Sequence, residues 1–345
     1  MIANIQKMKN KAKNNKLLTI EEISRHKESG IIGGNSTYLA LKHSTTYMIL
    51  TDEIGLKVIK NTKEVYSEKL PLAGGTADSA LYISHLDCFL ISQDAILYRK
   101  DINSKAPYIY MDLSDFDCDR ARLKYSPKNR RLIGVMDSDM LTAINMDEKR
   151  VELQVEKSSN EVSCFEVFGE NDHKLVTITE DACIQLHVFN FWMKKILSIF
   201  EQKINLIKER DEWGVSLAVC DRNEYILVEI QANIRYCSRM ILFKVKGNIL
   251  IKEAILDPYL EENRRKDALE CCGYYGGKLL WIGLEYIGFE RAQLFEYNTE
   301  THDLKELVEA RVEHREIWPL EIHRFGKKFY YTGVEGKVMN IILNV

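Results

Sequence analysis

The residues that could bind a metal ion or transfer protons lie in short polar segments between apolar runs. In the segment DFDCDR, Asp115, Asp117 and Asp119 occupy alternate positions. Carboxylates with this spacing begin an EF-hand calcium loop, but that loop continues with a glycine and a final glutamate. Here Arg120 and Ala121 follow instead. We expect a solvated acidic loop, with calcium as the minor alternative, and we predict no metal ion and no other cofactor.

Motifs of nucleophilic or phosphate chemistry are missing. The sequence has neither a G-x-S-x-G elbow nor a G-x-x-x-x-G-K-[ST] loop, and its eight histidines lack spacings such as H-E-x-x-H. AGGTADS, at residues 73–79, is expected to be a loop between two strands. The eight cysteines form no C-x-x-C pair, and most lie in apolar runs such as VSCFEVF. They predict reduced core thiols of an intracellular protein and no catalytic residue.

The elements that position these polar segments repeat along the chain. Residues 121–155 contain four short strand-like runs, ARLKY, LIGVM, MLTAI and VELQV. Similar sets of runs begin at Tyr38, Ala80, Val162, Val215 and Ala268, and a last set from Trp318 has only three runs. Starts roughly 40 to 55 residues apart, with four strands per unit, are typical of a β-propeller. The predicted fold is all-β, a single β-propeller of seven four-stranded blades.

The strand missing from the last blade is expected near the N-terminus. NKLLTIEEI, at residues 15–23, can supply it, and such closure removes open sheet edges. The propeller then extends over residues 15–345 as one domain, and residues 1–14 are predicted to be a solvated basic arm without a signal peptide. Residues 193–210 carry apolar side chains at i, i+3 and i+4, which leaves a short helix there as an alternative.

An acidic residue recurs in the turn between the second and third runs, with an apolar residue three positions later. The pairs are Glu53 and Leu56, Asp94 and Leu97, Asp137 and Met140, Asp181 and Ile184, and Glu335 and Val338. An acid at a tight turn can accept backbone N–H bonds and hold the hairpin. With YSPKNRRLIGVMDSD, this pattern resembles the WD-repeat β-propeller family over nearly the whole chain, although no Trp-Asp or Gly-His dipeptide marks the blades. The resemblance implies a scaffold that binds proteins or peptides without catalysis.

Charge is predicted to differ between the two loop faces of such a propeller. One face collects the loops between blades and the turns between second and third strands, and its residues are mostly acidic. The opposite face carries more lysine and arginine, diluted by acids such as Glu148 and Asp172. Clustered charge selects the sign of a partner. The predicted partner-binding residues are Asp115, Asp117, Asp119, Asp137, Asp139, Glu180, Asp181 and Trp213, the last as a loop anchor in ERDEWG.

These features favour a non-catalytic scaffold that binds a protein or basic peptide partner through its acidic face. Two alternatives remain: a hydrolase-like propeller enzyme with carboxylates at the central channel, and nucleic-acid binding through the basic face. A net charge of −3, from 48 basic and 51 acidic residues, disfavours nucleic acid. No apolar run reaches the roughly 18 residues of a membrane helix, so no membrane partner is expected. We expect an intracellular protein, cytoplasmic or alternatively nuclear.

Overall fold

Strands make up nearly all of the described chain. The computed structural model describes residues 18–25, 37–51, 55–68, 77–104, 106–116, 118–137, 139–156, 161–204, 212–220, 223–232, 237–256, 266–285, 291–311, 322–325, 327–332 and 337–344. In these residues the only helix is a 3-10 turn, η1 (Ser114–Phe116). The chain divides into two compact units, residues 28–205 and a terminal unit of residues 1–27 and 206–345.

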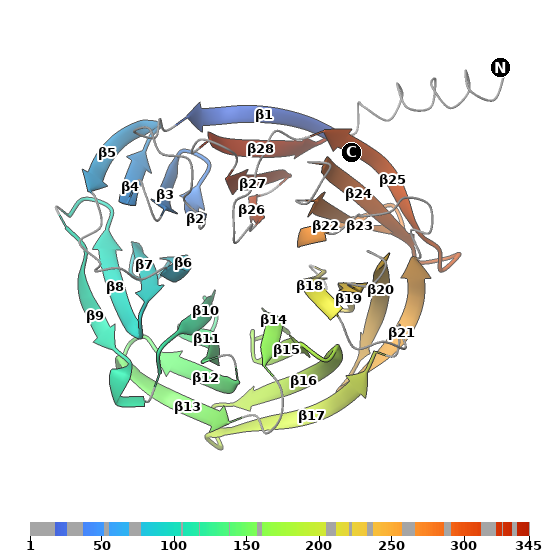
Figure 1. Ribbon diagram of the computed structural model, residues 1–345, viewed down its shortest axis with the longest axis horizontal. Coiled ribbons are helices and arrows are strands. Elements are labelled where there is room, and N and C mark those ends of the chain that lie inside the picture. Colours follow the sequence, from blue (N-terminus) through green and yellow to red (C-terminus); the bar gives the residue numbers. More distant parts are fainter. Residues whose placement is uncertain are drawn as a thin grey trace. The chain divides into compact units, whose positions relative to one another are not determined.

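The 28–205 unit consists of four antiparallel sheets of four strands, each in sequence order from the inner to the outer strand (Figure 1). The first two are β2 (Thr37–His43), β3 (Thr46–Thr51), β4 (Gly55–Lys60) and β5 (Lys63–Glu68), then β6 (Ala77–Ile83), β7 (Cys88–Gln93), β8 (Ile96–Asp101) and β9 (Tyr108–Asp112). The others are β10 (Ala121–Ser126), β11 (Arg131–Met136), β12 (Met140–Asn145) and β13 (Arg150–Glu156), then β14 (Val162–Phe168), β15 (Lys174–Thr179), β16 (Cys183–Asn190) and β17 (Lys195–Lys203).

The terminal unit has three sheets of the same kind. Two are β18 (Glu212–Val219), β19 (Tyr225–Ala232), β20 (Cys237–Lys246) and β21 (Ile249–Leu256), then β22 (Lys266–Tyr275), β23 (Lys278–Glu285), β24 (Arg291–Asn298) and β25 (Leu304–Arg311). The third is β26 (His323–Phe325), β27 (Lys328–Thr332), β28 (Lys337–Leu343) and β1 (Leu18–Arg25). The seven sheets are the blades of an all-β, seven-bladed propeller, which confirms the predicted fold class.

The N-terminal strand completes the last blade as predicted. β1 pairs antiparallel with β28, from Leu18 opposite Leu343 to Arg25 opposite Lys337. The structure therefore confirms that this sheet combines strands from both ends of the sequence. Residues 1–14 lie outside the described part of the chain, and the extent of a single domain over 15–345 stays a prediction.

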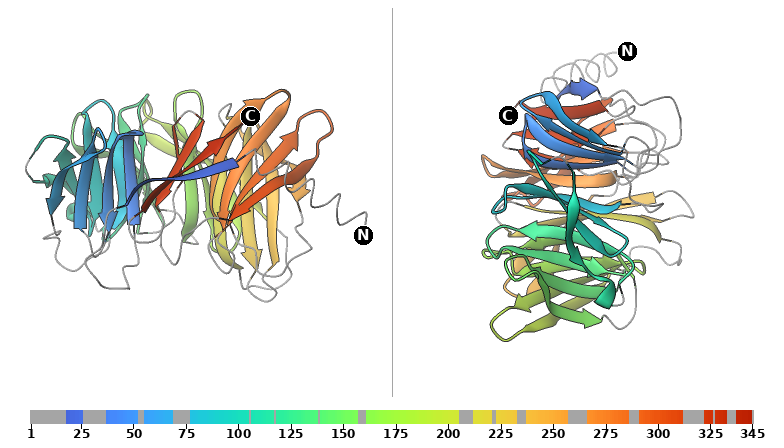
Figure 2. Two further views of the ribbon diagram at one scale, coloured as in Figure 1. Left: turned by 90° about the horizontal axis from the view of Figure 1, so that it is seen from above. Right: turned by 90° about the vertical axis from the view of Figure 1, so that its left-hand side faces the viewer.

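Apolar side chains on both faces of each sheet build the core between successive blades. In the 28–205 unit, one buried cluster joins the β2–β5 and β6–β9 blades, the next joins β6–β9 to β10–β13, and a third joins β10–β13 to β14–β17. Central strands are therefore buried on both faces, as β7 is at every position. This packing explains why second and third runs read as nearly continuous apolar sequence. The described turns between strands lie at the two ends of each blade (Figure 2).

The helix alternative for residues 193–210 is wrong where the structure describes them, because Lys195–Lys203 is strand β17. A register shift lies opposite Leu186 and His187, where Phe200 and Ser198 pair and Ile199 is bypassed. Such a bulge moves the following side chains to the other face of the sheet. Ile196 is buried and Ile199 and Phe200 are half-buried, so the bulged strand reproduces the i, i+3, i+4 spacing of a helix.

The predicted burial of the cysteines is confirmed for most of the seven whose side chains are described. Cys88, Cys118, Cys183, Cys220, Cys271 and Cys272 are buried and Cys164 is partly buried. Burial raises the pKa of the Cys88 thiol to about 11 and that of Cys118 to about 12. These thiols are therefore protonated packing groups at neutral pH.

Candidate functional site: an acidic loop face

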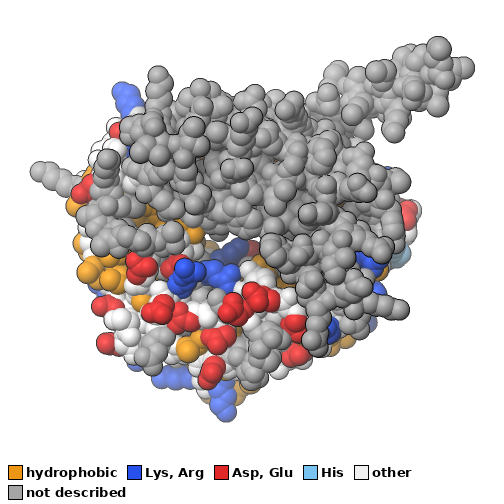
Figure 3. Space-filling view, in the orientation of Figure 1, with side chains coloured by type: hydrophobic (Ala, Val, Ile, Leu, Met, Phe, Trp, Pro, Cys, Tyr) orange, Lys and Arg blue, Asp and Glu red, His pale blue; other side chains and the backbone are white. Residues whose placement is uncertain are grey.

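Seven acidic residues of the 28–205 unit lie in loops at the same end of its blades. In an antiparallel four-stranded blade, the turn between the second and third strands and the loop before the first strand share one end. We name this set the acidic loop face: Asp94, Asp115, Asp119, Asp137, Asp139, Glu180 and Asp181. All seven side chains are exposed or half-exposed. Acidic side chains gather on the visible face of this unit in Figure 3, with a few basic side chains among them.

Asp137 joins two loops of this face. It lies in the β11–β12 turn, and its Oδ1 accepts hydrogen bonds from the backbone N–H groups of Asp119 (2.8 Å) and Arg120 (2.9 Å). Its own N–H donates to the Arg120 carbonyl at 2.9 Å. The predicted role, an acid that accepts backbone N–H bonds, is confirmed, although the donors belong to the loop before β10 instead of its own hairpin. Asp119 and Asp137 are thereby held side by side.

The other acidic turns use different local chemistry. Asp94 and Ala95 have φ of 47° and 59°, and Asp137 also has φ of 47°. Aspartate tolerates this left-handed region better than most residues, so its recurrence at these turns has a conformational cause. Asp181 instead accepts a 2.6 Å hydrogen bond from the Thr179 hydroxyl and lies 3.8 Å from the Lys203 ammonium. The neighbouring Glu180 donates its N–H to the Glu161 carbonyl at 3.0 Å.

Two inner-strand residues that the sequence analysis missed lie beside the acidic loop face. Asp78 of β6 has a buried Oδ2 that has no hydrogen-bond partner among the described residues. Burial raises the Asp78 pKa to about 6, with a smaller contribution from Asp94, while the Ala121 N–H and the charges of Arg120 and Arg122 lower it. Only their strand position could have singled out such residues, and AGGTADS was predicted to be a loop although Ala77–Ile83 is strand β6.

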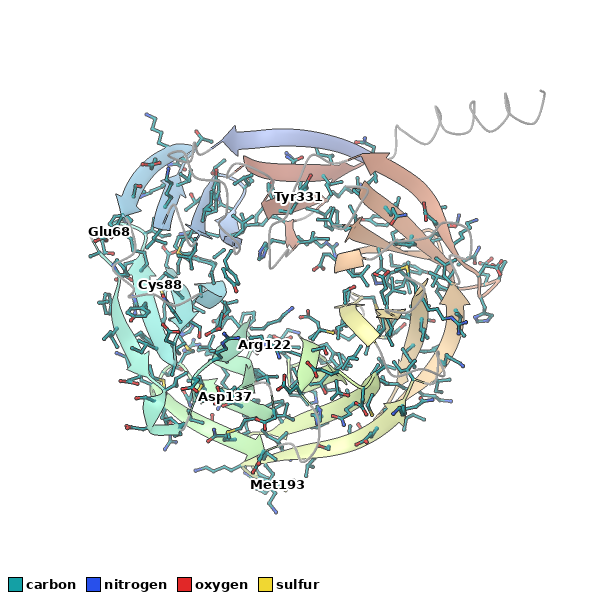
Figure 4. All side chains as sticks on the ribbon, viewed as in Figure 1. Glu68, Cys88, Arg122, Asp137, Met193 and Tyr331 are labelled. Carbon is teal, nitrogen blue, oxygen red and sulfur yellow. The ribbon has the colours of Figure 1, made fainter. Side chains whose placement is uncertain are left out.

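Arg122 links the inner strands of two blades. Its guanidinium donates to the Ser163 carbonyl at 2.9 Å and to the Val162 carbonyl, both in β14. Burial lowers its pKa, but an arginine stays protonated at neutral pH. Lys124, on the same strand, forms an ion pair with Glu166 of β14. Figure 4 shows Arg122 on the inner side of its blade and Asp137 farther out. Bases therefore interrupt the acidic loop face at its inner margin.

The opposite end of the same blades carries its charge mainly as ion pairs. Lys42 contacts Asp87 at 2.5 Å, Lys128 contacts Asp172 at 3.8 Å, Arg130 contacts Asp147 at 3.7 Å and Arg150 contacts Glu148 at 2.5 Å. Among the acidic loop face residues, only Asp181 has an ion pair with a described residue. Several acids at the opposite end are therefore paired with bases, whereas the acids of the acidic loop face have almost no ion-pair partner among the described residues.

The remaining predicted residues have separate outcomes. Asp115 is exposed in η1, and Asp139 lies half-exposed in the β11–β12 turn, while Asp117 lies outside the described residues. Trp213 is part of strand β18 in the terminal unit, not of a loop, and its side chain is outside the described set. The structure therefore brings Asp119 and Asp137 into contact and assigns Trp213 to the other compact unit.

Inner-strand carboxylates of the 28–205 unit bear on the enzyme alternative. β6 supplies Asp78 and β14 supplies Glu166, whereas β2 and β10 contain no acidic residue. Glu166 is paired with Lys124, and Asp78 is close to arginine charges. Across the described residues, no three His, Cys, Asp or Glu side chains are grouped so as to hold a metal ion.

No helix in the described part of the chain is long and apolar enough to cross a membrane.

Comparison with known proteins identifies the fold. No family model matches the sequence, and no curated protein matches it. A chain in the crystal structure of BBS1N in complex with ARL6DN superimposes with a TM-score of 0.61 at 10% identity, covering 94% of this chain and 96% of that one. A chain of the Mitotic Checkpoint Complex gives a TM-score of 0.64 at 8% identity, covering 93% and 91%. Both superpositions extend over most of either chain and agree with the propeller fold. At these identities the likeness concerns the fold alone.

Proposed function

We propose that this protein is a non-catalytic interaction scaffold that binds a basic protein or peptide through the acidic loop face. The observation that carries the proposal is the unequal distribution of charge in the 28–205 unit. The acids of this face have almost no ion-pair partner among the described residues, whereas several acids at the other end are neutralised. An array of solvated charge of one sign attracts and orients a partner of the other sign.

Hydrogen bonds also hold described residues of the face in place before any partner arrives. Asp137 binds two N–H groups of the neighbouring loop, and the Leu113 N–H donates to the Ala95 carbonyl at 2.8 Å. A site whose backbone is already ordered loses less conformational entropy on binding. Two similar structures come from complexes, BBS1N with ARL6DN and the Mitotic Checkpoint Complex, and these relationships support a protein partner here. Buried cysteines without a disulfide-type spacing in the sequence agree with an intracellular location, which we include in the proposal.

Affinity capture from the native source, analysed by mass spectrometry, tests the proposal. Wild type is compared with a variant in which Asp115, Asp119, Asp137 and Asp139 become Asn, a change that removes charge and keeps side-chain size. We expect the wild type to retain a basic partner that the variant loses. A stable partner retained equally by both proteins would leave a scaffold but refute the acidic loop face as its site.

A matched control separates local charge from net charge. Asp147→Asn, Glu148→Gln, Glu170→Gln and Asp172→Asn remove the same formal charge at the opposite end of the blades. The control variant should capture the partner like wild type. Loss of the partner from both variants would indicate a general effect of net charge and contradict a defined site.

A further inference from the structure

The turn between β16 and β17 exposes an apolar patch that the acidic loop face does not use. Trp192 is 90% exposed, Met193 is 46% exposed and Leu197, on the following strand, is 40% exposed. Met193 projects from the outer edge of the unit in Figure 4. Single exposed apolar residues are ordinary, but three within six positions, including a nearly fully exposed tryptophan, are typical of a docking surface.

The turn holds these side chains in a defined geometry. The Met193 N–H donates to Asn190 Oδ1 at 2.9 Å, and Lys194 closes the turn with φ of 51°. Beneath it, the Phe191 ring lies 4.2 Å from the Arg131 guanidinium carbon and 6.1 Å from the Phe189 ring. Trp192 therefore extends from an ordered base. A rigid aromatic side chain provides contact area at a small entropic cost.

The charged side chains of residues 191–197 are all basic. Lys194 and Lys195 follow Met193 directly, and both are exposed. Neither forms an ion pair with any residue in the described part of the chain. Lys195 and Leu197 are two positions apart, ahead of the bulge, so their side chains share one face of β17. A complementary ligand must combine apolar side chains with carboxylates.

We propose that residues 191–197 form a second docking site, which binds an acidic segment with apolar side chains on a partner protein. In each blade the turn between the third and fourth strands lies at the end opposite the acidic loop face. The site at residues 191–197 would bind an acidic partner, whereas the acidic loop face would bind a basic one. The chain would then hold two partners of opposite charge at once. An anionic lipid surface also attracts tryptophan and lysine, but the acids of the same unit would be repelled by it, whereas a peptide contacts the turn alone.

A phage-displayed library of random peptides of about 16 residues tests this site, a length sufficient for an amphipathic segment. The library is selected on the full chain and, in parallel, on Trp192→Ala, a change at a side chain that contacts little of the protein. We expect the peptides that require Trp192 to be enriched in Asp and Glu together with Leu, Phe or Trp. An enriched peptide should bind Trp192→Ala about 30-fold more weakly than wild type, as for an interface anchor.

Two further variants make the result specific. Lys194→Glu combined with Lys195→Glu should weaken the same peptide at least about tenfold, by charge repulsion. Ile109→Ala, at an apolar side chain 59% exposed on β9, should leave the affinity unchanged. The proposal is overturned if no enriched peptide depends on Trp192, or if the dependent peptides are basic. It is also overturned if only vesicles with about 30% anionic lipid bind in a Trp192-dependent manner, since the ligand is then a membrane surface.

Discussion

Replacement of Asp137 separates three contributions that this residue makes to the acidic loop face. Its Oδ1 accepts two backbone N–H bonds, at 2.8 and 2.9 Å, and its φ is 47°. A charge-assisted hydrogen bond contributes about 1.5 to 3 kcal/mol when buried. Asp137 is half-exposed, so we assign about 1 kcal/mol to each of the two bonds, which is the central net value for hydrogen bonds and lies below the range for charged groups.

The three substitutions give a predicted order. Asp137→Asn keeps an oxygen acceptor and tolerates the left-handed φ, so it should lower the free energy of unfolding by less than about 1 kcal/mol. Asp137→Gly loses both hydrogen bonds, and glycine adopts this positive φ without strain, so the variant should lower the free energy of unfolding by about 2 kcal/mol. Asp137→Ala loses the same bonds and keeps a Cβ in the left-handed region, so it should lower the free energy of unfolding by about 1 kcal/mol more than the glycine variant does.

Urea unfolding followed by far-UV circular dichroism measures this order, with unchanged m-values as the check that only stability has changed. Amide hydrogen exchange at Asp119 and Arg120 provides the local readout, since these N–H groups lose their acceptor. A glycine variant as stable as wild type would refute the assigned bond energies. An asparagine variant as unstable as glycine would show that the charge, and not the acceptor, holds the loop.

Three more substitutions or treatments probe the packing and the titration of this protein. Asp78→Asn should remove a pH dependence of stability. Because the pKa of Asp78 is raised to about 6 in the folded protein, wild type loses stability as the pH rises from about 4 to 6. Urea unfolding at several pH values should therefore show that the variant is the more stable protein above pH 6. Gly134→Ala should lower the free energy of unfolding by about 3 kcal/mol, because the new Cβ would lie 2.1 Å from the Arg122 carbonyl oxygen. Only a marginal decrease in the melting temperature would contradict that geometry. Cys88 and Cys118 should resist iodoacetamide at pH 8 until the protein is denatured, as measured by peptide mass spectrometry, and rapid native labelling would contradict their burial.

The blade pattern was predictable because its signals are local. A strand alternates its side chains between two faces, and the polar turns between strands interrupt the apolar runs at short intervals. The pairing of β1 with β28 was predictable for a different reason, since the last set of runs lacked one strand. The one ambiguous segment contains a bulge, which shifts the faces at Ile199 and so imitates helical spacing. Bulges leave no distinct mark on sequence alone.

The site was predictable only in part. Antiparallel topology fixes which loops share an end, and the contact of Asp119 with Asp137 follows from that rule. Arg122 and Asp78 were missed because a polar residue in an alternating strand has the same pattern whether it faces bulk solvent or an adjacent blade. Some ion pairs at the opposite end join side chains of neighbouring blades, as in Lys128 with Asp172, and spacing along the chain does not encode those pairs.

The affinity of the captured partner, measured at two salt concentrations, tests most directly whether the acidic loop face is the binding site. Binding is measured for wild type, for the Asp115, Asp119, Asp137 and Asp139 to Asn variant, and for the opposite-end control, at about 50 and about 200 mM NaCl, where screening differs strongly. We predict that the variant binds at least about tenfold more weakly at low salt and loses most of its salt dependence, while the control behaves as wild type. Equal affinities and equal salt dependence in all three proteins would contradict the proposed site.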